Sequence, residues 1–512
     1  MADLESPEKI YRRAVNYHAS GELEQARVLY RLVEYYKPDN PMLLNMYGLL
    51  ALNFGELDVA RYRLAKSVEL LPDYPEALNH LGLLHLRLKE PKKAEGFFLR
   101  ALALVPNFVN AMSNLSGLYE QEGDRVKAID YAERVLVLDS DHIQTRINLA
   151  VMYLRDDRLL ESETLLESVI ASGISNSMVL TNLGIAKVRL GKHQRGRELY
   201  KEAIAQDPGA LTAHEQLALD LLRHREFQQG WNHYEYRNRG SNLVKIQHLI
   251  PAGRTLDYPS EKPVVSWEGL RVHVISEQGL GDELFFLRYL PEVVRRGAVV
   301  SYASTKRITP LISQWAEENN IQLGTVNSTH QIDRLFAIGD LPLALKSDDY
   351  PTAVKLSPKS DLVKKLTELY SSSKRPWVGI TRRAGTKNSR SDYLYKELPN
   401  GYLESILSDC CGTVFDFTRI TDGNDDKFKS AMKGLNWIDV SEMTKDLEQT
   451  LALLVLLDDY IGVSNTNIHL LAGLGKQAHV YIPFPADFRW FVSGASEWFP
   501  GFHVVREEVA DK

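Results

Sequence analysis

The sequence has few cysteines, no long apolar run and no large excess of charge. Its two cysteines, Cys410 and Cys411, are adjacent, and neighbouring cysteines rarely pair. We therefore expect no disulfide and a reducing, cytoplasmic location. The first nine residues, MADLESPEK, carry acidic side chains and no apolar segment, so we expect no secretory signal there. The longest strongly apolar run, residues 451–457, is far too short to span a bilayer.

The charge balance and the length narrow the class of protein. A formal net charge of -6 argues against nucleic-acid binding as the main activity. Of the 512 residues, 25% are charged and 44% are hydrophobic, which is ordinary for a water-soluble protein of two or three domains. The one Asp-x-Asp pair, Asp139 and Asp141, falls in a predicted turn between helices, so we do not expect it to bind a metal.

A period of 34 residues runs through the first half of the chain. It resembles the period of the tetratricopeptide repeat, a two-helix unit that stacks into a superhelix. Each unit has a small residue at its eighth position, where the two helices of a unit would approach closely; examples are Gly48, Gly82 and Gly184. The units begin at Pro7, Pro41, Pro75, Val109, Ile143, Ser177 and Leu211.

The seventh unit departs from this pattern. It keeps the small residue Ala218 but changes at Gly230 and Trp231, and we expect it to cap the array against the next domain. The array then covers residues 1–237, and residues 238–266, rich in glycine and proline, form an irregular connector.

The sixth position of the repeat carries a ladder of polar side chains. They are His80, Asn114, Asn148 and Asn182. An amide that recurs along one helical face suits hydrogen bonding to an extended peptide backbone, so these residues are our candidates for a groove that holds an acceptor protein. The alternative is that the amides cap neighbouring turns or bind water.

Beyond residue 266 the pattern changes to alternating strands and helices. Two successive series predict two doubly wound α/β halves facing a cleft, residues 267–360 and 375–512. In such sheets ligands bind beyond the carboxyl ends of the strands. Strands are expected in residues 271–276, 299–303, 377–381, 413–417, 437–440, 460–463 and 478–482, and residues 333–342 are expected to form a further strand and a turn.

The loop after the first of these strands is rich in glycine. Gly279 and Gly281 permit a tight turn and bring a ligand close to backbone N–H groups, and the helix start favours an anion. Gln278 lies in the same turn. Asp282, assisted by Glu283, is our candidate to deprotonate or orient an acceptor hydroxyl. The alternative for Asp282 is a helix N-cap.

The loop after the first strand of the second series is basic. Arg383, Thr386, Lys387 and Arg390 suit a phosphate or diphosphate leaving group. The alternative is a solvated basic loop. Arg382 or Arg383 could also face the edge of the sheet.

A third polar turn follows the strand at residues 460–463. Ser464, Asn465, Thr466 and Asn467 lead into a helix whose free N–H groups would meet a phosphate, and His469 lies one turn further on. The alternative is a plain cluster of helix caps, with His469 structural.

The tail, residues 483–500, is unusually aromatic. It could stack on a nucleotide base, or it could lock the last helix across the two halves. We favour the structural interpretation.

Two strings in the second half carry a family resemblance. EQGLGDELFFLRYLP and GVSNTNIHLLAGLGKQAHVYIPFPADFRWF resemble the glycosyltransferase-like domain of bacterial tetratricopeptide-repeat proteins, which is similar to the heptosyltransferases. The resemblance covers roughly residues 267–506 and implies the GT-B fold, a nucleotide-sugar donor and no metal or other cofactor. The whole architecture is similar to protein glycosyltransferases, including those that modify flagellin, and to the O-GlcNAc transferases, whose superhelix also carries an asparagine ladder.

The resemblance assigns roles to particular residues. Gly281 and Asp282 match the Gly-Asp pair of heptosyltransferases, in which the Asp is the candidate base. His469 matches the histidine of their late helix. Ser464 and Asn465 stand where that family usually has Asp-Thr, so a carboxylate is missing here.

These observations predict a cytoplasmic protein O-glycosyltransferase. It would transfer a sugar from a nucleotide-sugar to a Ser or Thr of an acceptor protein held in the repeat groove, with flagellin as one candidate acceptor. One alternative is a protein-binding scaffold whose transferase fold is inactive. Another is a transferase that acts on a saccharide or a lipid-linked glycan.

Overall fold

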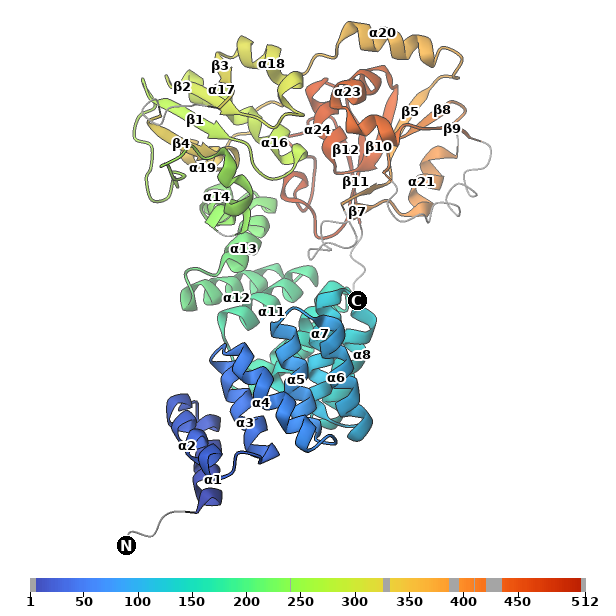
Figure 1. Ribbon diagram of the computed structural model, residues 1–512. Coiled ribbons are helices and arrows are strands. Elements are labelled where there is room, and N and C mark those ends of the chain that lie inside the picture. Colours follow the sequence, from blue (N-terminus) through green and yellow to red (C-terminus); the bar gives the residue numbers. More distant parts are fainter. Residues whose placement is uncertain are drawn as a thin grey trace. The chain divides into compact units, whose positions relative to one another are not determined.

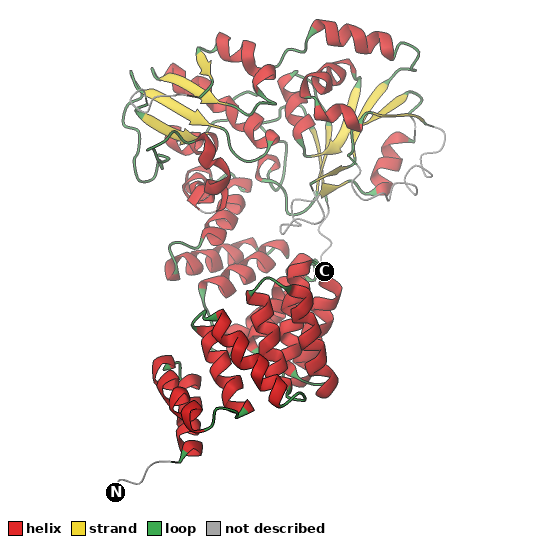
Figure 2. Cartoon of the chain, in the orientation of Figure 1, coloured by secondary structure: helices red, strands yellow, loops and turns green. Residues whose placement is uncertain are grey.

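The computed structural model describes residues 6–239, 241–325, 332–385, 396–408, 410–419 and 435–507. The chain divides into two compact units, Met1–Ile174 and Ser175–Lys512. Figure 1 labels the elements along the chain, and Figure 2 separates helices from strands. Each unit is described by itself.

The first unit consists of helical hairpins. Each odd-numbered helix packs against the helix that follows it, and the first helix of every pair begins at the residue where a predicted 34-residue unit begins. The period therefore predicted the helices correctly. They are α1 (Pro7–Ala19), α2 (Leu23–Tyr36), α3 (Pro41–Asn53), α4 (Leu57–Leu70), α5 (Pro75–Arg87), α6 (Pro91–Leu104), α7 (Val109–Glu122), α8 (Arg125–Leu138), α9 (Ile143–Arg155) and α10 (Leu159–Ala171).

Local sequence explains where these helices begin and how closely they pack. Proline occupies the first helical position of α1, α3, α5 and α6, where its missing N–H has no helical partner to lose. The Asn40 side chain caps α3 by accepting from the N–H groups of Met42 and Leu43. A Cβ at Gly82 would clash with the ring of Phe98, so a small residue is required where α5 crosses α6.

The second unit begins with two more hairpins and continues into the sheets. The hairpins are α11 (Ser177–Arg189) with α12 (His193–Gln206), and α13 (Leu211–Arg223) with α14 (Phe227–Tyr234). The 3₁₀ turn η1 (Glu235–Arg239), the short helix α15 (Ser241–Ile246) and a second 3₁₀ turn, η2 (Gln247–Leu249), lead out of the last hairpin.

The first sheet is parallel, with strand order β3-β2-β1-β4. Its order changes direction between β1 and β4, and loops at such a point form a crevice. Residues 333–342 contain a strand, Arg334–Ala337, followed directly by a 3₁₀ turn, η5 (Ile338–Asp340), which matches the strand and turn expected there. The elements are β1 (Arg271–Ile275), α16 (Leu280–Phe286), η3 (Leu287–Tyr289), α17 (Leu290–Arg295), β2 (Val299–Ala303), α18 (Thr309–Glu318), β3 (Ile321–Leu323), β4 (Arg334–Ala337) and α19 (Leu341–Leu345).

The second sheet is also parallel, with strand order β12-β11-β10-β5-β8-β9. Counted along the chain this is the order 3-2-1-4-5-6 of doubly wound nucleotide-binding sheets, with its reversal between β5 and β10. A small antiparallel pair, β6 with β7, lies outside it. The elements are α20 (Ser360–Leu369), β5 (Trp377–Thr381), β6 (Arg383–Ala384), β7 (Lys396–Glu397), α21 (Asn400–Leu407), β8 (Thr413–Asp416), β9 (Asn436–Asp439), η7 (Ser441–Lys445), α23 (Leu447–Leu456), β10 (Asp459–Val463), α24 (Thr466–Gly473), β11 (His479–Ile482), η8 (Phe488–Trp490) and β12 (His503–Arg506).

The last hairpin shares a hydrophobic core with the sheets. Trp231 packs against Phe286 and Phe488, with ring centroids 6.1 and 5.8 Å away, and Phe227 packs against Trp498 at 5.4 Å. The last hairpin, which is the seventh repeat, therefore packs directly against the α/β region. The shared core also explains why the compact units divide inside the repeat array, at residue 174, and not at its end.

The aromatic tail belongs to this same core. Trp490 and Trp498 are fully buried, and Phe491 and Phe499 are buried beside them. Rings this enclosed have little surface left to stack on a base, which agrees with the structural interpretation. Among the described helices, none is both long and apolar enough to cross a membrane.

Alanine substitutions at Gly82 and Gly96 test the close contact between α5 and α6. Gly82→Ala should destabilise the first unit by about 1–3 kcal/mol, because the new methyl group displaces the Phe98 ring. Gly96→Ala is the matched control, since a Cβ there meets nothing within 4 Å, and it should stabilise by up to about 1 kcal/mol through helix propensity. Thermal unfolding followed by circular dichroism at 222 nm compares them; equal midpoints would contradict the contact.

Candidate functional site

The loop after β1 holds Asp282 through two interactions. Asp282 Oδ2 accepts a hydrogen bond from the Gly279 N–H at 3.3 Å; the N-cap of α16 is Gly279 and not Asp282, which lies at the third helical position and reaches back to it, as in a capping box. Its Oδ1 accepts from Nη1 of Arg489 at 2.8 Å. Gln278 and Gly279 are exposed beside it, while Gly281 and Asp282 are partly exposed. The loop is thus open to a ligand, but the carboxylate is already paired.

Glu283 faces the sheet and not the loop. Its carboxylate accepts hydrogen bonds from the Tyr302 hydroxyl at 2.8 Å and from the Thr305 N–H at 3.0 Å, and the residue is 1% exposed. Burial raises the pKa of Glu283. The side chain fastens α16 to β2 and is closed to solvent, so the catalytic assistance expected of Glu283 is corrected to a structural role.

The turn after β10 caps α24. Asn465 accepts a hydrogen bond from the Asn467 N–H at 2.8 Å, and Thr466 is the first helical residue. Ser464 is buried, and its Oγ accepts from Nε1 of Trp490 at 2.9 Å. The capping alternative therefore accounts for Asn465. Its Oδ1 also accepts from the Ile468 N–H at 3.4 Å, so an anion at this helix start would have to displace the Asn465 side chain from these two N–H groups.

The side chains one turn into α24 are buried. Asn467 donates from Nδ2 to the Tyr460 hydroxyl at 3.0 Å. His469 packs against the rings of Phe285 and Phe499, with centroids 6.2 and 5.3 Å away. Burial holds the pKa of His469 well below its usual value, so the ring is neutral. Among the described residues, Nδ1 of His469 has no hydrogen-bond partner.

The loops of the two sheets meet. A Cβ at Gly281 would lie 3.2 Å from Cδ2 of His469 and 3.8 Å from Cα of Thr466, so this glycine allows the first loop to approach α24 closely. The Asp282–Arg489 pair spans the same junction. Since both loops follow strands at their carboxyl ends, the carboxyl edges of the two parallel sheets face each other, and the predicted first and third loops come together.

The sequence-based prediction missed a charged group at this junction. Arg489 makes two hydrogen bonds to Asp487, at 2.9 and 2.6 Å, and Lys396 lies 3.5 Å from the same carboxylate. Burial opposes ionisation of Asp487, but the two cations outweigh it and lower its pKa. The signal was present in the sequence: Asp487 and Arg489 closely follow the strand β11, but the surrounding aromatic residues directed attention to packing.

The basic loop after β5 is described only in part. Arg382 is buried and donates to Asp416 Oδ2 at 2.8 Å, and Arg383 pairs with Glu397 across the β6–β7 hairpin at 2.5 Å. Arg382 thus faces the sheet edge, as one alternative proposed. The phosphate contacts predicted for three further residues lie outside the described part of the chain: Thr386, Lys387 and Arg390.

Two ladder residues of the first unit join neighbouring repeats. Nδ1 of His80 lies 2.7 Å from Oδ1 of Asn45, and Asn114 donates from Nδ2 to Oδ1 of Asn79 at 2.8 Å. Asn45 and Asn79 are buried, and each is in the preceding repeat, one position earlier in the unit. Burial lowers the pKa of His80 to about 4. Part of the ladder therefore fastens one hairpin to the next.

The remaining ladder residues differ. Asn148 is exposed and accepts from Nε2 of Gln144 at 2.9 Å, a contact within its own helix. Asn182 is partly buried on α11 and belongs to the second unit. Of the ladder in the first unit, Asn148 is the most open to a peptide.

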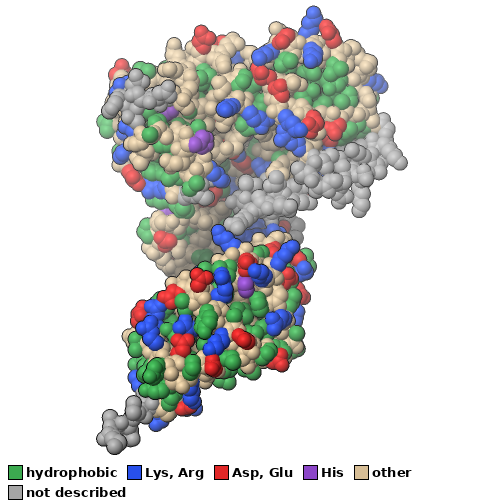
Figure 3. All heavy atoms as spheres, viewed as in Figure 1, with side chains coloured by type: hydrophobic (Ala, Val, Ile, Leu, Met, Phe, Trp, Pro, Cys, Tyr) green, Lys and Arg blue, Asp and Glu red, His purple; other side chains and the backbone are tan. Residues whose placement is uncertain are grey.

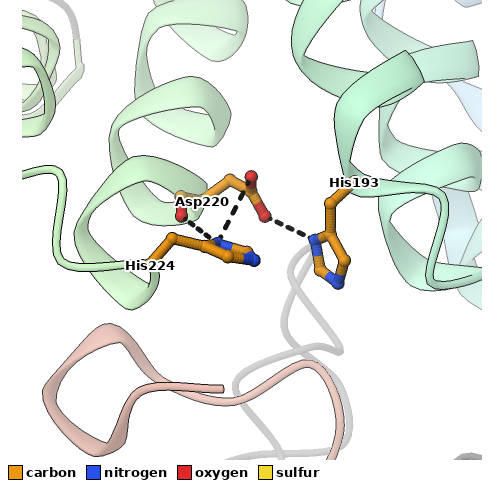
Figure 4. Close-up of side chains that lie close together, drawn as sticks. All are labelled: His193, Asp220 and His224. Carbon is orange, nitrogen blue, oxygen red and sulfur yellow. Dashed lines mark hydrogen bonds and ion pairs between the residues drawn. The ribbon is translucent and has the colours of Figure 1, made fainter. Parts of the chain in front are cut away.

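A cluster of charged side chains joins α12 to α13. His193, Asp220 and His224 lie with their potential ligand atoms within 4.8 Å of one another (Figure 4). The Asp220 carboxylate, however, is already paired with Arg197 at 2.5 Å and lies 3.6 Å from the buried Arg223. Two guanidinium groups on one carboxylate disfavour a divalent cation there. We therefore interpret the cluster as an ion-pair hub.

In the described part of the chain, neither the visible surface of the first unit nor the two cavities indicates another site. Acidic and basic side chains are intermixed over the visible face of the first unit (Figure 3). A cavity of 330 Å³ lies at the amino ends of β10 and β11, beside Asp459 and His479, and another of 230 Å³ lies between α18 and α23. Ligands of parallel sheets bind at the opposite, carboxyl ends, so we give more weight to the loop junction than to these cavities.

Comparison with known proteins identifies the repeats. Sequence models of the tetratricopeptide repeat match residues 75–108, 111–142 and 181–229. The chain therefore contains tetratricopeptide repeats, as the period predicted, and such repeats are typical of protein-binding scaffolds. No curated protein sequence matches the chain.

Solved structures of other repeat proteins are distantly similar. The Pseudomonas aeruginosa pilF protein is 17% identical with a TM-score of 0.39, over 41% of this chain and 96% of that one. YrrB, described as a TPR protein with an unusual peptide-binding site, is 16% identical with a TM-score of 0.31. The match covers 36% of this chain and 95% of YrrB. The Cut9-Hcn1 hetero-tetramer of APC/C is 15% identical with a TM-score of 0.40, and the match covers 44% of this chain and 45% of that one.

The ion-pair hub should be sensitive to substitution and to acid. Asp220→Asn should destabilise the second unit by about 3–5 kcal/mol, because Arg223 stays buried without its carboxylate. Although burial alone would raise it, the hydrogen bond from His193 and the charge of Arg223 lower the pKa of Asp220 to about 2. The stabilisation is therefore complete above the unfolded-state pKa of about 4 and is lost as the pH falls toward 2.

Tryptophan fluorescence measures this effect selectively, because all seven tryptophans lie in the second unit. Glu226→Gln is the matched control: Glu226 also pairs with Arg197 but is partly exposed, so its loss should change stability by about 1 kcal/mol or less. Equal thermal midpoints for the two variants at pH 7 would contradict the hub.

Proposed function

We propose that the chain is a protein O-glycosyltransferase of the GT-B type, in which the repeats hold an acceptor protein and the α/β region transfers a sugar from a nucleotide-sugar to its Ser or Thr. The observation that carries this proposal is the junction of the two parallel sheets. Their carboxyl edges face each other, and polar loops from both sides meet there, at Asp282 and at the start of α24.

The second sheet supplies the donor side of the proposed site. Its strand order is that of nucleotide-binding sheets, and the turn at Ser464 and Asn465 lies at its switch point. The N–H groups at the start of α24 would receive a phosphate. Arg489, with Lys396 beside it, would add positive charge where the nucleotide departs.

The first sheet supplies the acceptor side. Asp282 would orient or deprotonate the acceptor hydroxyl once its pairing with Arg489 is released. A diphosphate group could effect that release, because it would compete with the carboxylate for the same guanidinium. The two bonds to Asp487 would keep Arg489 in place meanwhile.

A scaffold with an inactive transferase fold is the second candidate. It is favoured by the same contacts: Asp282 is paired with Arg489, and Asn465 stands in the turn as a helix cap, with no carboxylate at that position. A scaffold would use the repeats in the same way but would bind no nucleotide. Nucleotide binding therefore separates the two candidates.

Intact-mass analysis of a candidate acceptor such as flagellin, co-expressed with the chain, tests the transferase. We expect a mass increase of one or more sugars. Asp282→Asn should reduce the rate of modification by about 10²-fold or more while nucleotide binding persists. Asp361→Asn, an exposed carboxylate on α20, is the control and should not change the rate. Full-rate modification by Asp282→Asn would remove Asp282 from the mechanism.

Alanine variants of Asn148 and Asn114 test whether the ladder binds the acceptor protein, because Asn148 is exposed whereas Asn114 bonds to the preceding repeat. Asn148→Ala should weaken acceptor modification with little loss of stability, because Asn148 is exposed. Asn114→Ala should lower the thermal stability of the first unit, because it removes a hydrogen bond between repeats. Nucleotide binding, measured by thermal shift with UDP, GDP, ADP and CMP compounds, should persist in both variants. Undiminished modification by Asn148→Ala would contradict its place in the groove.

A further inference from the structure

The end of the repeat array touches the loop that carries Asp282. We propose that Tyr234 and Arg237, at the end of the last repeat, are positioning residues that set the conformation of residues 277–282, so that the array forms part of the site. This inference rests on the proposed function where it concerns catalysis, and on geometry alone where it concerns the loop.

Tyr234 holds Gln278 in a strained conformation. Gln278 has a φ of 60°, in the left-handed region that residues other than glycine seldom adopt. Its Oε1 accepts a hydrogen bond from the Tyr234 hydroxyl at 3.2 Å. The Tyr234 ring is itself fixed, because it packs among Trp231, Phe286 and Phe488. A fixed donor on the repeat thus stabilises the exposed turn next to Gly279.

Arg237 holds the residue before this turn. Its guanidinium donates to both carboxylate oxygens of Glu277, and Glu277 Oε1 also accepts from the Gly339 N–H at 2.7 Å. Nη1 of Arg237 lies 2.8 Å from Asp340 Oδ1. All three charged side chains are buried. A Cβ at Gly339 would clash with Arg237 and Glu277, so β1, β4 and the repeat are packed closely here.

The two contacts act on consecutive loop residues. Arg237 fixes Glu277 and Tyr234 fixes Gln278, and the next residue, Gly279, donates its N–H to the Asp282 carboxylate. A change in the last repeat is therefore transmitted to the orientation of Asp282 through a hydrogen bond to the loop, the loop backbone, and the hydrogen bond from Gly279 to Asp282. An array joined by a flexible tether would have no such route.

Tyr234→Phe tests the hydrogen bond to Gln278 alone, because it removes the hydroxyl and keeps the packed ring. Backbone amide hydrogen exchange in residues 278–283 should become about 2- to 10-fold faster, the ratio expected for the loss of one neutral hydrogen bond. Tyr236→Phe is the matched control: that ring stacks on His214 with centroids 3.5 Å apart, and its variant should leave exchange in the loop unchanged. Arg237 is unsuited to this test, since its loss would leave two buried carboxylates uncompensated.

A double variant tests whether the effect on Asp282 depends on the strained Gln278 turn. Gln278→Gly in the Tyr234→Phe background should restore part of the lost protection at Gly281 to Glu283, because glycine adopts a positive φ without strain. In the transfer assay, Tyr234→Phe should lower kcat by a similar factor with KM for the acceptor little changed. Unchanged exchange in Tyr234→Phe would overturn the inference. Altered exchange in a chain that modifies no acceptor would uphold the positioning role and reject the proposed function.

Discussion

The buried contact between the last repeat and the two sheets is the constraint on which the second unit depends. Trp231 and Phe227 supply its apolar part, and Arg237 supplies its charged part by pairing with two buried carboxylates. Burying an arginine so completely is favourable only when its partners are fixed in place, which the packed rings around it ensure. As a result the end of the repeat array packs closely against β1 and β4, and the Asp282 loop begins at this contact.

A second constraint joins the two sheets. Gly281 has no side chain, which allows the loop after β1 to contact α24 closely, and Arg489 forms ion pairs with both Asp282 and Asp487. Each contact places a strand end from one sheet against a strand end from the other. The charges at this junction balance, because it holds two carboxylates, Asp282 and Asp487, and two cations, Arg489 and Lys396. An incoming anion would therefore have to break one of these existing ion pairs. The proposed chemistry follows from that redistribution and not from a vacant positive pocket.

Much of this fold could be predicted from the sequence, because it depends on local patterns. The 34-residue period located the first helix of each repeat, and short apolar runs located β1, β2, β5 and β10. The three-residue strand β3 and the edge strand β12 were missed, since neither has a distinctive pattern. The site was harder to predict. Asp282 stood out by its glycines, but its partner Arg489 is 207 residues away and lies in an aromatic segment. Glu283 was misjudged because pattern alone does not show which side of a helix is buried.

The most direct test of the account is an experimental structure of the chain with a bound nucleoside diphosphate. We predict density at the junction of the two sheets, with the diphosphate within hydrogen-bond distance of the N–H groups at the start of α24 and of Arg489, and with the Asp282–Arg489 pair opened. A nucleotide bound elsewhere, such as in the cavity beside Asp459 and His479, would contradict the account. So would a fully ordered junction that stays empty at millimolar nucleotide.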